Sequence, residues 1–233
     1  MKLRERRALA AAPASALADA DRAALLRLVS LLLQYPDEEL LAARVDLAAA
    51  AADLPEGPWR RSLVEFTAWF AAARPMECAR HYVTTFDLRR RSSLYLTYYL
   101  HGDTRRRGMA MLTLKQRFRA AGLTPPADEL PDHLPVVCEF AALAGPGTGE
   151  APLRQHRRGL ELIRAALRDS GSPYVHVLDA LCAALPPLTD GDRDAVADLV
   201  AAGPPAEDVG LAPFGPPDHM TGTPFMSSRE ACR

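Results

Sequence analysis

The 233-residue sequence has few of the features that mark several classes of protein. Its formal net charge is only -1, so it lacks the basic excess from which nucleic-acid binders gain affinity for phosphates, and we expect no nucleic-acid partner. Its four cysteines lie far apart and form no C-x-x-C pair, unlike a zinc site or a disulfide-rich secreted domain; they are Cys78, Cys138, Cys182 and Cys232. We interpret them as buried, reduced thiols. No run approaches the roughly 20 apolar residues that span a bilayer, so we expect no stable membrane insertion.

Motifs for common catalytic and cofactor sites are also missing. The glycine-rich segment 145–149 has no lysine and follows no predicted strand, so it does not match a phosphate-binding loop. The six histidines form no H-E-x-x-H or similar pair, and no G-x-S-x-G nucleophile motif occurs. We therefore expect no cofactor, no metal site and no catalytic residue. These absences argue against the common classes of enzyme.

The hydrophobic pattern that is present is helical. Leu25, Leu28, Val29 and Leu32 follow the i, i+3, i+4, i+7 spacing of one helix face, and the chain is rich in alanine, the strongest helix former. Similar patterns, some of them after an aspartate that can cap a helix (Asp37, Asp103, Asp132), predict further helices over 38–53, 58–73, 76–86, 104–121, 132–144, 151–169, 173–185 and 190–202. The predicted fold is therefore all-α, a single globular helical domain of about nine helices.

The aromatic segment 91–100 is the one stretch that also suits a strand, because it contains Leu94, Tyr95, Leu96, Tyr98 and Tyr99. As a strand it would be alone in the chain, and a lone strand has nothing with which to pair. We therefore predict a helix here as well.

Both ends of the chain differ from its middle. Residues 1–20 start with a basic cluster that resembles a signal peptide, but Glu5, Pro13 and Ser15 interrupt it, so we predict a flexible basic N-terminal arm. Residues 21–202 form the predicted helical domain. Residues 203–233 are rich in proline and glycine and have little periodicity, which predicts a disordered tail.

Two kinds of segment are candidates for binding. The runs Arg89, Arg90, Arg91 and Arg105, Arg106, Arg107 are either solvated helix ends or a basic rim that meets an acidic segment or a phosphate. The second candidate is the corner 129–135, in which Asp132 can cap a helix and Pro135 can occupy its first turn. This corner is either a well-built helix start or a polar site that recognises a peptide or a charged group.

Four motifs, in order, resemble one known family. They are the segments 82–87 (Tyr-Val-Thr-Thr-Phe-Asp), 93–96 (Ser-Leu-Tyr-Leu), 102–108 (Gly-Asp-Thr-Arg-Arg-Arg-Gly) and 129–135 (Glu-Leu-Pro-Asp-His-Leu-Pro), and the opening 32–37 fits as well. From about residue 22 to about residue 200, the sequence resembles the NarJ-type nitrate reductase assembly chaperones of the wider TorD/DmsD family of redox-enzyme maturation proteins.

The resemblance implies a helical, cytoplasmic chaperone that is not an enzyme. Such proteins bind the N-terminal segment of a molybdenum enzyme's catalytic subunit and hold it competent for insertion of the molybdenum cofactor. The resemblance places peptide binding near Glu129, Asp132 and His133, with Tyr95, Tyr98 and Tyr99 as weaker candidates. If the two arginine runs form a basic rim, they would speed the binding of such a peptide. Some relatives self-associate, so weak self-association stays open.

Two other functions remain as alternatives. The arginine clusters could hold a phosphate in a helical nucleotide-binding protein, although the glycine-lysine loop is missing. A helical DNA-binding regulator is the other alternative, and the near-neutral charge argues against it.

Overall fold

The computed structural model describes residues 17–189 together with 191, 194, 196 and 197. The described part is helical, with no strand, and the prediction of an all-α fold is confirmed. The helices are α1 (Asp19–Leu32), α2 (Glu38–Ala42), α3 (Arg44–Asp53), α4 (Pro58–Ala72), α5 (Pro75–Tyr82), α6 (Tyr98–His101), α7 (Arg105–Ala120), α8 (Leu134–Ala144), α9 (Ala151–Gln155), α10 (Arg157–Asp169) and α11 (Val175–Ala184). A π-helical turn (Val83–Asp87) and a 3-10 turn (Arg90–Ser92) follow α5.

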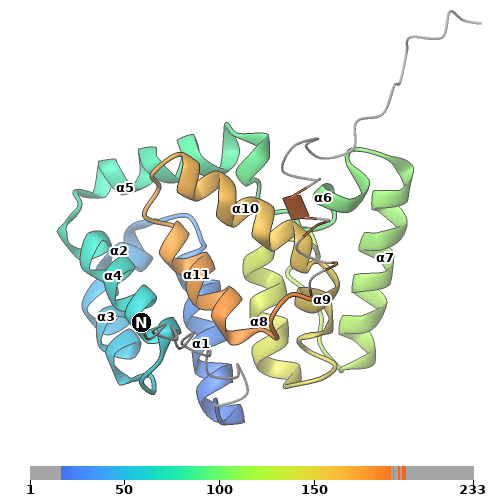
Figure 1. Ribbon diagram of the computed structural model, residues 1–233, viewed down its shortest axis with the longest axis horizontal. Coiled ribbons are helices and arrows are strands. Elements are labelled where there is room, and N and C mark those ends of the chain that lie inside the picture. The colour runs from blue at the N-terminus through green and yellow to red at the C-terminus, as the bar shows by residue number, and fades with distance from the viewer. Residues whose placement is uncertain (1–16, 190, 192–193, 195, 198–233) are drawn as a thin grey trace, which may run out of the picture.

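The core lies where α1, α4 and α11 meet. In Figure 1, α11 lies over the middle of the bundle, and it packs against α4, α10 and α1, while α1 also packs along α8. Leucines and aromatic rings fill the space between these helices, among them Leu25, Leu63, Phe66, Tyr174 and Leu178. Such burial of apolar surface supplies most of the driving force for folding.

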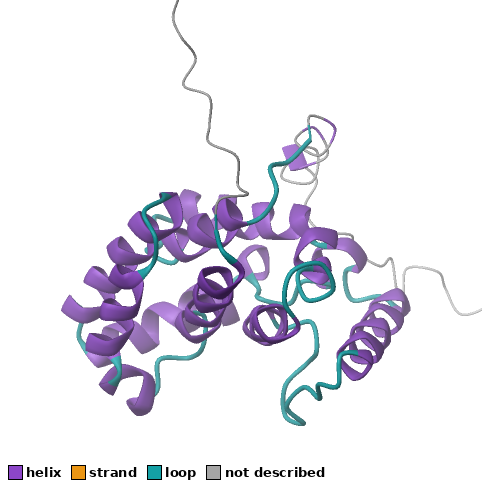
Figure 2. Ribbon diagram, turned by 90° about the horizontal axis from the view of Figure 1, so that it is seen from below, coloured by secondary structure: helices purple, strands orange, loops and turns teal. Residues whose placement is uncertain are grey.

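Helix α7 lies at the edge of the molecule, as Figures 1 and 2 show. Only two of its side chains are fully buried, Leu114 and Phe118. Phe118 packs with Val136 and Phe140 of α8 in a small second cluster, with its ring centroid 4.3 Å from that of Phe140. Gly122, with a φ of 74°, ends the helix in the left-handed conformation that glycine adopts without strain.

Helix ends show which local predictions hold. Asp37 caps α2 as predicted, because its carboxylate accepts a hydrogen bond of 2.8 Å from the Leu40 amide. Asp103 and Asp132 were predicted as caps, and both predictions are wrong. Asp103 accepts a hydrogen bond from Arg107, while α8 starts only at Leu134 and has Pro135 in its first turn.

Two predicted helices are interrupted. The backbone leaves the helical conformation at Ala43, which separates α2 from α3, and at His156, which separates α9 from α10. Neither position carries a proline or glycine, so no helix-breaking residue in the sequence predicts these interruptions.

The prediction of one helix over 91–100 is wrong. Residues 90–92 form the 3-10 turn, residues 93–97 are irregular with a single bridge at Tyr95, and only Tyr98–His101 is α-helical. Tyr95 forms an isolated antiparallel bridge with His133, in which the Leu96 amide donates to the Asp132 carbonyl and the Leu134 amide donates to the Leu94 carbonyl. The irregular segment 93–97 thus pairs with a loop in which the sequence shows no strand pattern.

The ends of the chain lie mostly outside the described residues. The predicted arm is described only from Leu17, which is buried in the core, and α1 already begins at Asp19, so the folded part begins before the predicted boundary at 21. The predicted helix 190–202 is described at four positions, all helical, and the tail 203–233 lies outside the described residues. No helix in the described part is long and apolar enough to cross a membrane.

Candidate functional site

A cavity of about 310 Å³ opens where the π-helical turn, the 3-10 turn, α6 and the start of α7 come together. It is lined by residues of three of the motifs singled out in the sequence and by three residues between those motifs, Arg89, Arg90 and Tyr98. The full lining is Phe86, Asp87, Arg89, Arg90, Ser93, Tyr95, Tyr98, Asp103 and Arg107. The fold therefore gathers motifs that are separate in the sequence around one opening.

Tyr95 connects this cavity to the fourth motif. Its ring lies 5.2 Å from the imidazole of His133, measured between centroids, and the guanidinium carbon of Arg107 lies 5.5 Å from the same ring. The bridge between Tyr95 and His133 fixes this arrangement through the backbone. Burial, followed by the charge of Glu129, raises the pKa of the Tyr95 hydroxyl, so Tyr95 remains a neutral donor at physiological pH.

Asp132 lies behind the cavity wall and is completely buried. One carboxylate oxygen accepts hydrogen bonds from the amide of Thr97, at 3.3 Å, and from the hydroxyl of the same residue, and lies 3.5 Å from a guanidinium nitrogen of Arg107. The other oxygen has no hydrogen-bond partner in the described part of the chain. The carboxylate therefore holds Thr97 and Arg107 in place, and it is not accessible to a partner in this structure.

His133 and Glu129 form the outer part of the corner. The Nδ1 atom of His133 lies 3.1 Å from the Glu129 carboxylate, which is itself exposed. Burial lowers the pKa of His133, while the charges of Glu129 and Asp132 act in the opposite direction. Because burial has the larger effect, the imidazole is neutral at physiological pH.

The three tyrosines of the aromatic segment have different surroundings. Tyr95 and Tyr98 are half-buried and line the cavity. Tyr99 is only 1% exposed, and its hydroxyl lies 2.8 Å from the Ser93 carbonyl oxygen and 3.1 Å from that of Arg91. The Tyr99 side chain thus belongs to the core, and a bound peptide could not reach it in this arrangement.

The two arginine runs do not form one continuous rim at the cavity. Arg89, Arg90 and Arg107 line it. The remaining three arginines are exposed and do not line this cavity; they are Arg91, Arg105 and Arg106. Arg107 is the most constrained, because its guanidinium also donates to Asp103 at 3.2 Å and to the Thr97 hydroxyl at 3.4 Å.

The cavity is chemically mixed. Three arginines face two carboxylates, those of Asp87 and Asp103, and the apolar part of the wall comes from Phe86 and the two tyrosines. Such a surface offers hydrogen-bond donors and acceptors beside aromatic rings, which suits a polypeptide segment better than a multiply charged phosphate. Sequence reasoning did not select Phe86, Asp87 or Asp103, although all three lie inside the quoted motifs.

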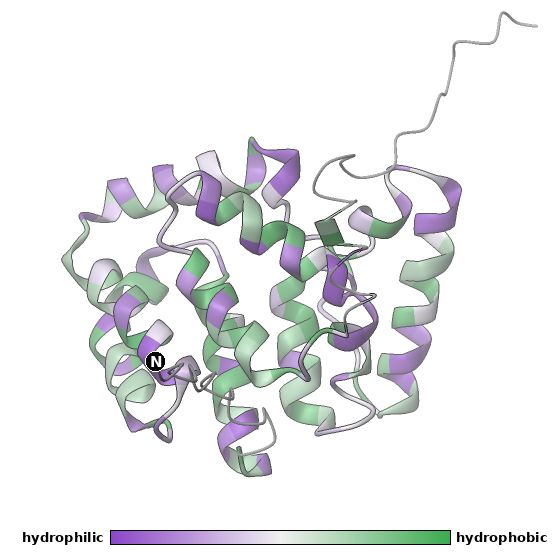
Figure 3. Cartoon of the chain, viewed as in Figure 1, coloured by the Kyte–Doolittle hydropathy of each residue, from purple (hydrophilic) through white to green (hydrophobic). Residues whose placement is uncertain are grey.

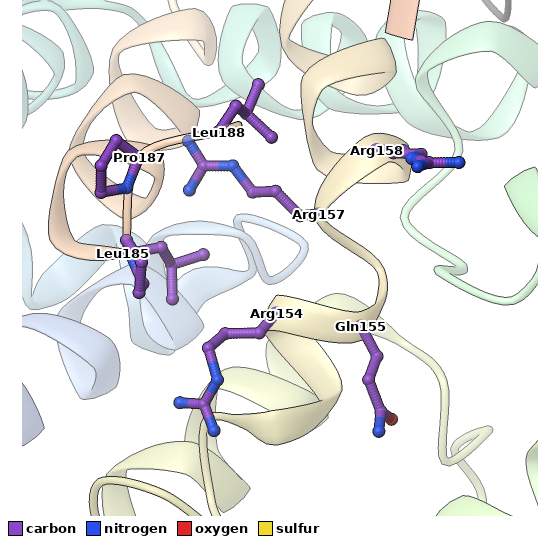
Figure 4. Close-up of a pocket in the computed structure, with 8 residues that line it drawn as sticks. Arg154, Gln155, Arg157, Arg158, Leu185, Pro187 and Leu188 are labelled. Carbon is purple, nitrogen blue, oxygen red and sulfur yellow. The ribbon is translucent and has the colours of Figure 1, made fainter. Parts of the chain in front are cut away.

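A second cavity, of about 270 Å³, lies between the α9–α10 junction and residues 185–188 (Figure 4). Its arginines are already engaged. Arg157 donates to Glu161 at 2.8 Å and to the Cys182 carbonyl at 3.0 Å, and Arg154 donates to the Gly147 carbonyl at 2.7 Å. This opening contains none of the predicted site residues, and we place the candidate site at the first cavity.

No group of three or more His, Cys, Asp or Glu side chains in the described residues is placed so that it could hold a metal ion.

Comparison with known proteins identifies the family. The family model described as "Nitrate reductase delta subunit" matches residues 51–180. The chain is 33% identical over 182 residues to the Bacillus subtilis protein named "Probable nitrate reductase molybdenum cofactor assembly chaperone NarJ", covering 78% of this chain and 98% of that protein. The chain belongs to the nitrate reductase delta subunit family.

One further relative matches in sequence over part of its length, and one solved structure matches in fold. The chain is 40% identical over 153 residues to the "Nitrate reductase-like protein NarX" of Mycobacterium tuberculosis, which covers 66% of this chain but only 23% of that much longer protein. A crystal structure of an Archaeoglobus fulgidus protein assigned to redox enzyme maturation superposes with a TM-score of 0.54 at 21% identity, covering 69% of this chain and 91% of that one. The last comparison shows that this chain shares its helical fold with that protein.

Proposed function

We propose that this protein is an assembly chaperone for a molybdenum-dependent nitrate reductase. It binds the N-terminal segment of the catalytic subunit, keeps that subunit competent for insertion of the molybdenum cofactor, and catalyses no reaction itself. The observation that carries the proposal is the similarity to NarJ over nearly the full length of that relative. The cavity at the family motifs is the proposed peptide site, and the proposed place of action is the cytoplasm.

The geometry supports this proposal in two ways. The cavity combines aromatic side chains with charges of both signs, so a short segment with apolar and charged side chains can be held without burying an unpaired charge. The buried network of Asp132, Thr97 and Arg107 makes one wall rigid before the segment arrives, which lowers the entropic cost of binding.

The proposed contacts differ from residue to residue. Tyr95, Tyr98 and Arg107 touch the segment directly, together with Arg89 and Arg90 at the mouth. Glu129 and His133 act from behind Tyr95, and Asp132 acts by positioning Arg107. An affinity near micromolar, about -8 kcal/mol, fits a partner that must later be released.

The test is a calorimetric titration of the full chain with a synthetic peptide of the N-terminal segment of the nitrate reductase catalytic subunit from the same organism. A scrambled peptide is the first control. We expect the double variant Tyr98→Ala, Arg90→Ala to weaken binding at least tenfold, since an aromatic and an arginine at an interface centre each contribute roughly 1–2 kcal/mol. The matched variant Trp69→Ala, Arg61→Ala changes a half-buried aromatic and an exposed arginine of α4, neither of which lines the cavity, and should keep the affinity.

A second measurement addresses the role in assembly. In cells that lack this protein, the catalytic subunit should accumulate with little molybdenum, and the wild-type chain should restore the metal content more than the double variant does. Binding of the scrambled peptide with equal affinity, or full molybdenum content without the chain, would contradict the proposal. Binding of a common nucleotide in the cavity would instead favour the phosphate-binding alternative.

A further inference from the structure

Helix α7 has an unusual charge pattern. Its sixteen residues contain six cations and no acid. Two of the cations have partners: Arg107 at the cavity, and Arg117, which donates to the Gln155 side chain at 3.0 Å. The other four are exposed and form no ion pair with any described residue; they are Arg105, Arg106, Lys115 and Arg119.

The outer face of this helix is also partly apolar. Arg105, Met109, Leu112, Gln116 and Arg119 follow the spacing i, i+4, i+7, i+11, i+14, so they form one stripe along the helix. Met109 is 66% exposed and Leu112 is 44% exposed. Figure 3 shows hydrophobic and hydrophilic residues mixed along α7 at the edge of the molecule.

This pattern works against the stability of the helix itself. Three arginines occupy the first turn, where the positive end of the helix dipole repels cations, and no acidic residue is present there. Apolar side chains that remain in water gain nothing from folding. A surface that breaks two local rules at once indicates selection for an external contact.

Lys115 lies beside this stripe, three residues after Leu112 and four before Arg119. We propose that the outer face of α7, formed by the stripe and Lys115, binds the surface of a bilayer that contains anionic phospholipids. Helix α7 would lie along the headgroups, with its cations among the lipid phosphates and Met109 and Leu112 inserted at the acyl boundary. The stripe from Arg105 to Arg119 measures about 21 Å along the helix axis.

Three features favour this partner over others. Charge of a single sign provides no register, which a specific protein interface needs and a uniform anionic surface does not. The residues of the stripe are exposed on a helix at the edge of the molecule (Figure 2), and they line neither of the two cavities described above, so the stripe is not the wall of either cavity. Exposed apolar side chains between cations are typical of interfacial helices, whereas nucleic-acid phosphates offer nothing apolar at their surface.

The experiment is sedimentation of the full chain with vesicles of phosphatidylcholine that contain phosphatidylglycerol, compared with vesicles of phosphatidylcholine alone. We expect binding only to the anionic vesicles, and we expect added salt to weaken it. The triple variant Arg105→Gln, Lys115→Gln, Arg119→Gln should lower the partition coefficient about a hundredfold, since each cation at the surface contributes roughly a factor of five. The double variant Met109→Ser, Leu112→Ser should lower it about tenfold through lost apolar burial.

The matched control is the variant Arg27→Gln, Arg61→Gln, Arg80→Gln, which removes three exposed arginines from α1, α4 and α5. It makes the same change in net charge and should bind the anionic vesicles as the wild type does. Circular dichroism verifies that each variant keeps its helix content.

Vesicle binding that is absent, that is equal with neutral lipid, or that falls equally in the control variant overturns the proposal. Binding of a duplex DNA probe in place of vesicles, lost in the α7 triple variant, would assign the face to nucleic acid and likewise overturn it.

Discussion

At the scale of single residues, Asp132 connects Thr97, which precedes α6, to Arg107 of α7. We expect Asp132→Ala to lower the free energy of unfolding by about 1–3 kcal/mol, because it leaves the buried Thr97 amide without an acceptor and removes a partner of Arg107. Asp132→Asn keeps an acceptor at the same place and should cost less. Urea unfolding followed by circular dichroism measures both. The nearby exposed Asp128→Ala is the control, and an Asp132→Ala protein as stable as this control would contradict the structural role.

The neighbouring histidine provides a second test at this scale. Burial lowers the pKa of His133, and the carboxylate of Glu129 partly offsets that effect. Neutralising Glu129 should therefore lower the pKa of His133 further. A titration of the imidazole signals by NMR, in the wild type and in Glu129→Gln, measures the shift.

Glu139→Gln, on the exposed side of α8, serves as the control and should leave the His133 titration unchanged. If Glu129→Gln raises the pKa of His133, or leaves it unaltered, then the pair seen at 3.1 Å is not formed in solution.

At the scale of secondary structure elements, periodicity was a good guide where one helix face is buried and a poor one at the site. The spacing of Leu25, Val29 and Leu32 was enough to predict α1. The segment 93–97 could not be predicted in the same way, because its partner is a three-residue stretch around His133 that has no strand pattern of its own. Long-range pairing between two irregular segments leaves no periodic signal, and the aromatic residues of segment 91–100 were the only indication.

A long-range interaction also explains why Asp132 was misassigned as a helix cap. An aspartate before an apolar run predicts a cap, but the carboxylate of Asp132 interacts across the fold with Thr97 and Arg107 instead. The sequence therefore indicated which residues matter at this corner, through the family motif, and not what each of them does. The division between direct contact and positioning came only from burial and distance.

The first turn of α7 leads to a prediction about this element. Arg106 is exposed and forms no ion pair in the described part of the chain, and the helix dipole disfavours its charge. Arg106→Gln should therefore raise the free energy of unfolding by about 0.3–1 kcal/mol, since glutamine and arginine have similar helix propensities. Urea unfolding is the measurement, with Lys115→Gln in the middle of the same helix as the control that should change little. Destabilisation by Arg106→Gln would show that this arginine has a favourable partner within the protein.

At the scale of the whole molecule, charge is distributed very unevenly. Residues 88–119 carry nine arginines and lysines and a single acid, Asp103, although the whole chain has a net charge of -1. The total charge of a sequence averages over such a region. A near-neutral total therefore does not by itself exclude an anionic partner for one face of the molecule. The fold class, by contrast, was predictable as a whole because every long periodic segment pointed to helix.

The pH dependence of stability also belongs to the whole molecule. Burial lowers the pKa of His81, His133 and His156 in the folded protein. Between each lowered value and the unfolded value of about 6.5, the unfolded chain binds more protons than the folded one. The stabilisation is therefore complete above about pH 6.5 and is lost as the pH falls through the pKa values of the folded protein.

Urea unfolding at a series of pH values should show this loss before carboxylates begin to titrate, near pH 5. Replacing His133 by glutamine should make the slope shallower. A stability that is constant, or that rises, as the pH falls over this range would mean that these histidines are protonated without cost, and hence that their surroundings in solution are more open to water than the packed structure allows.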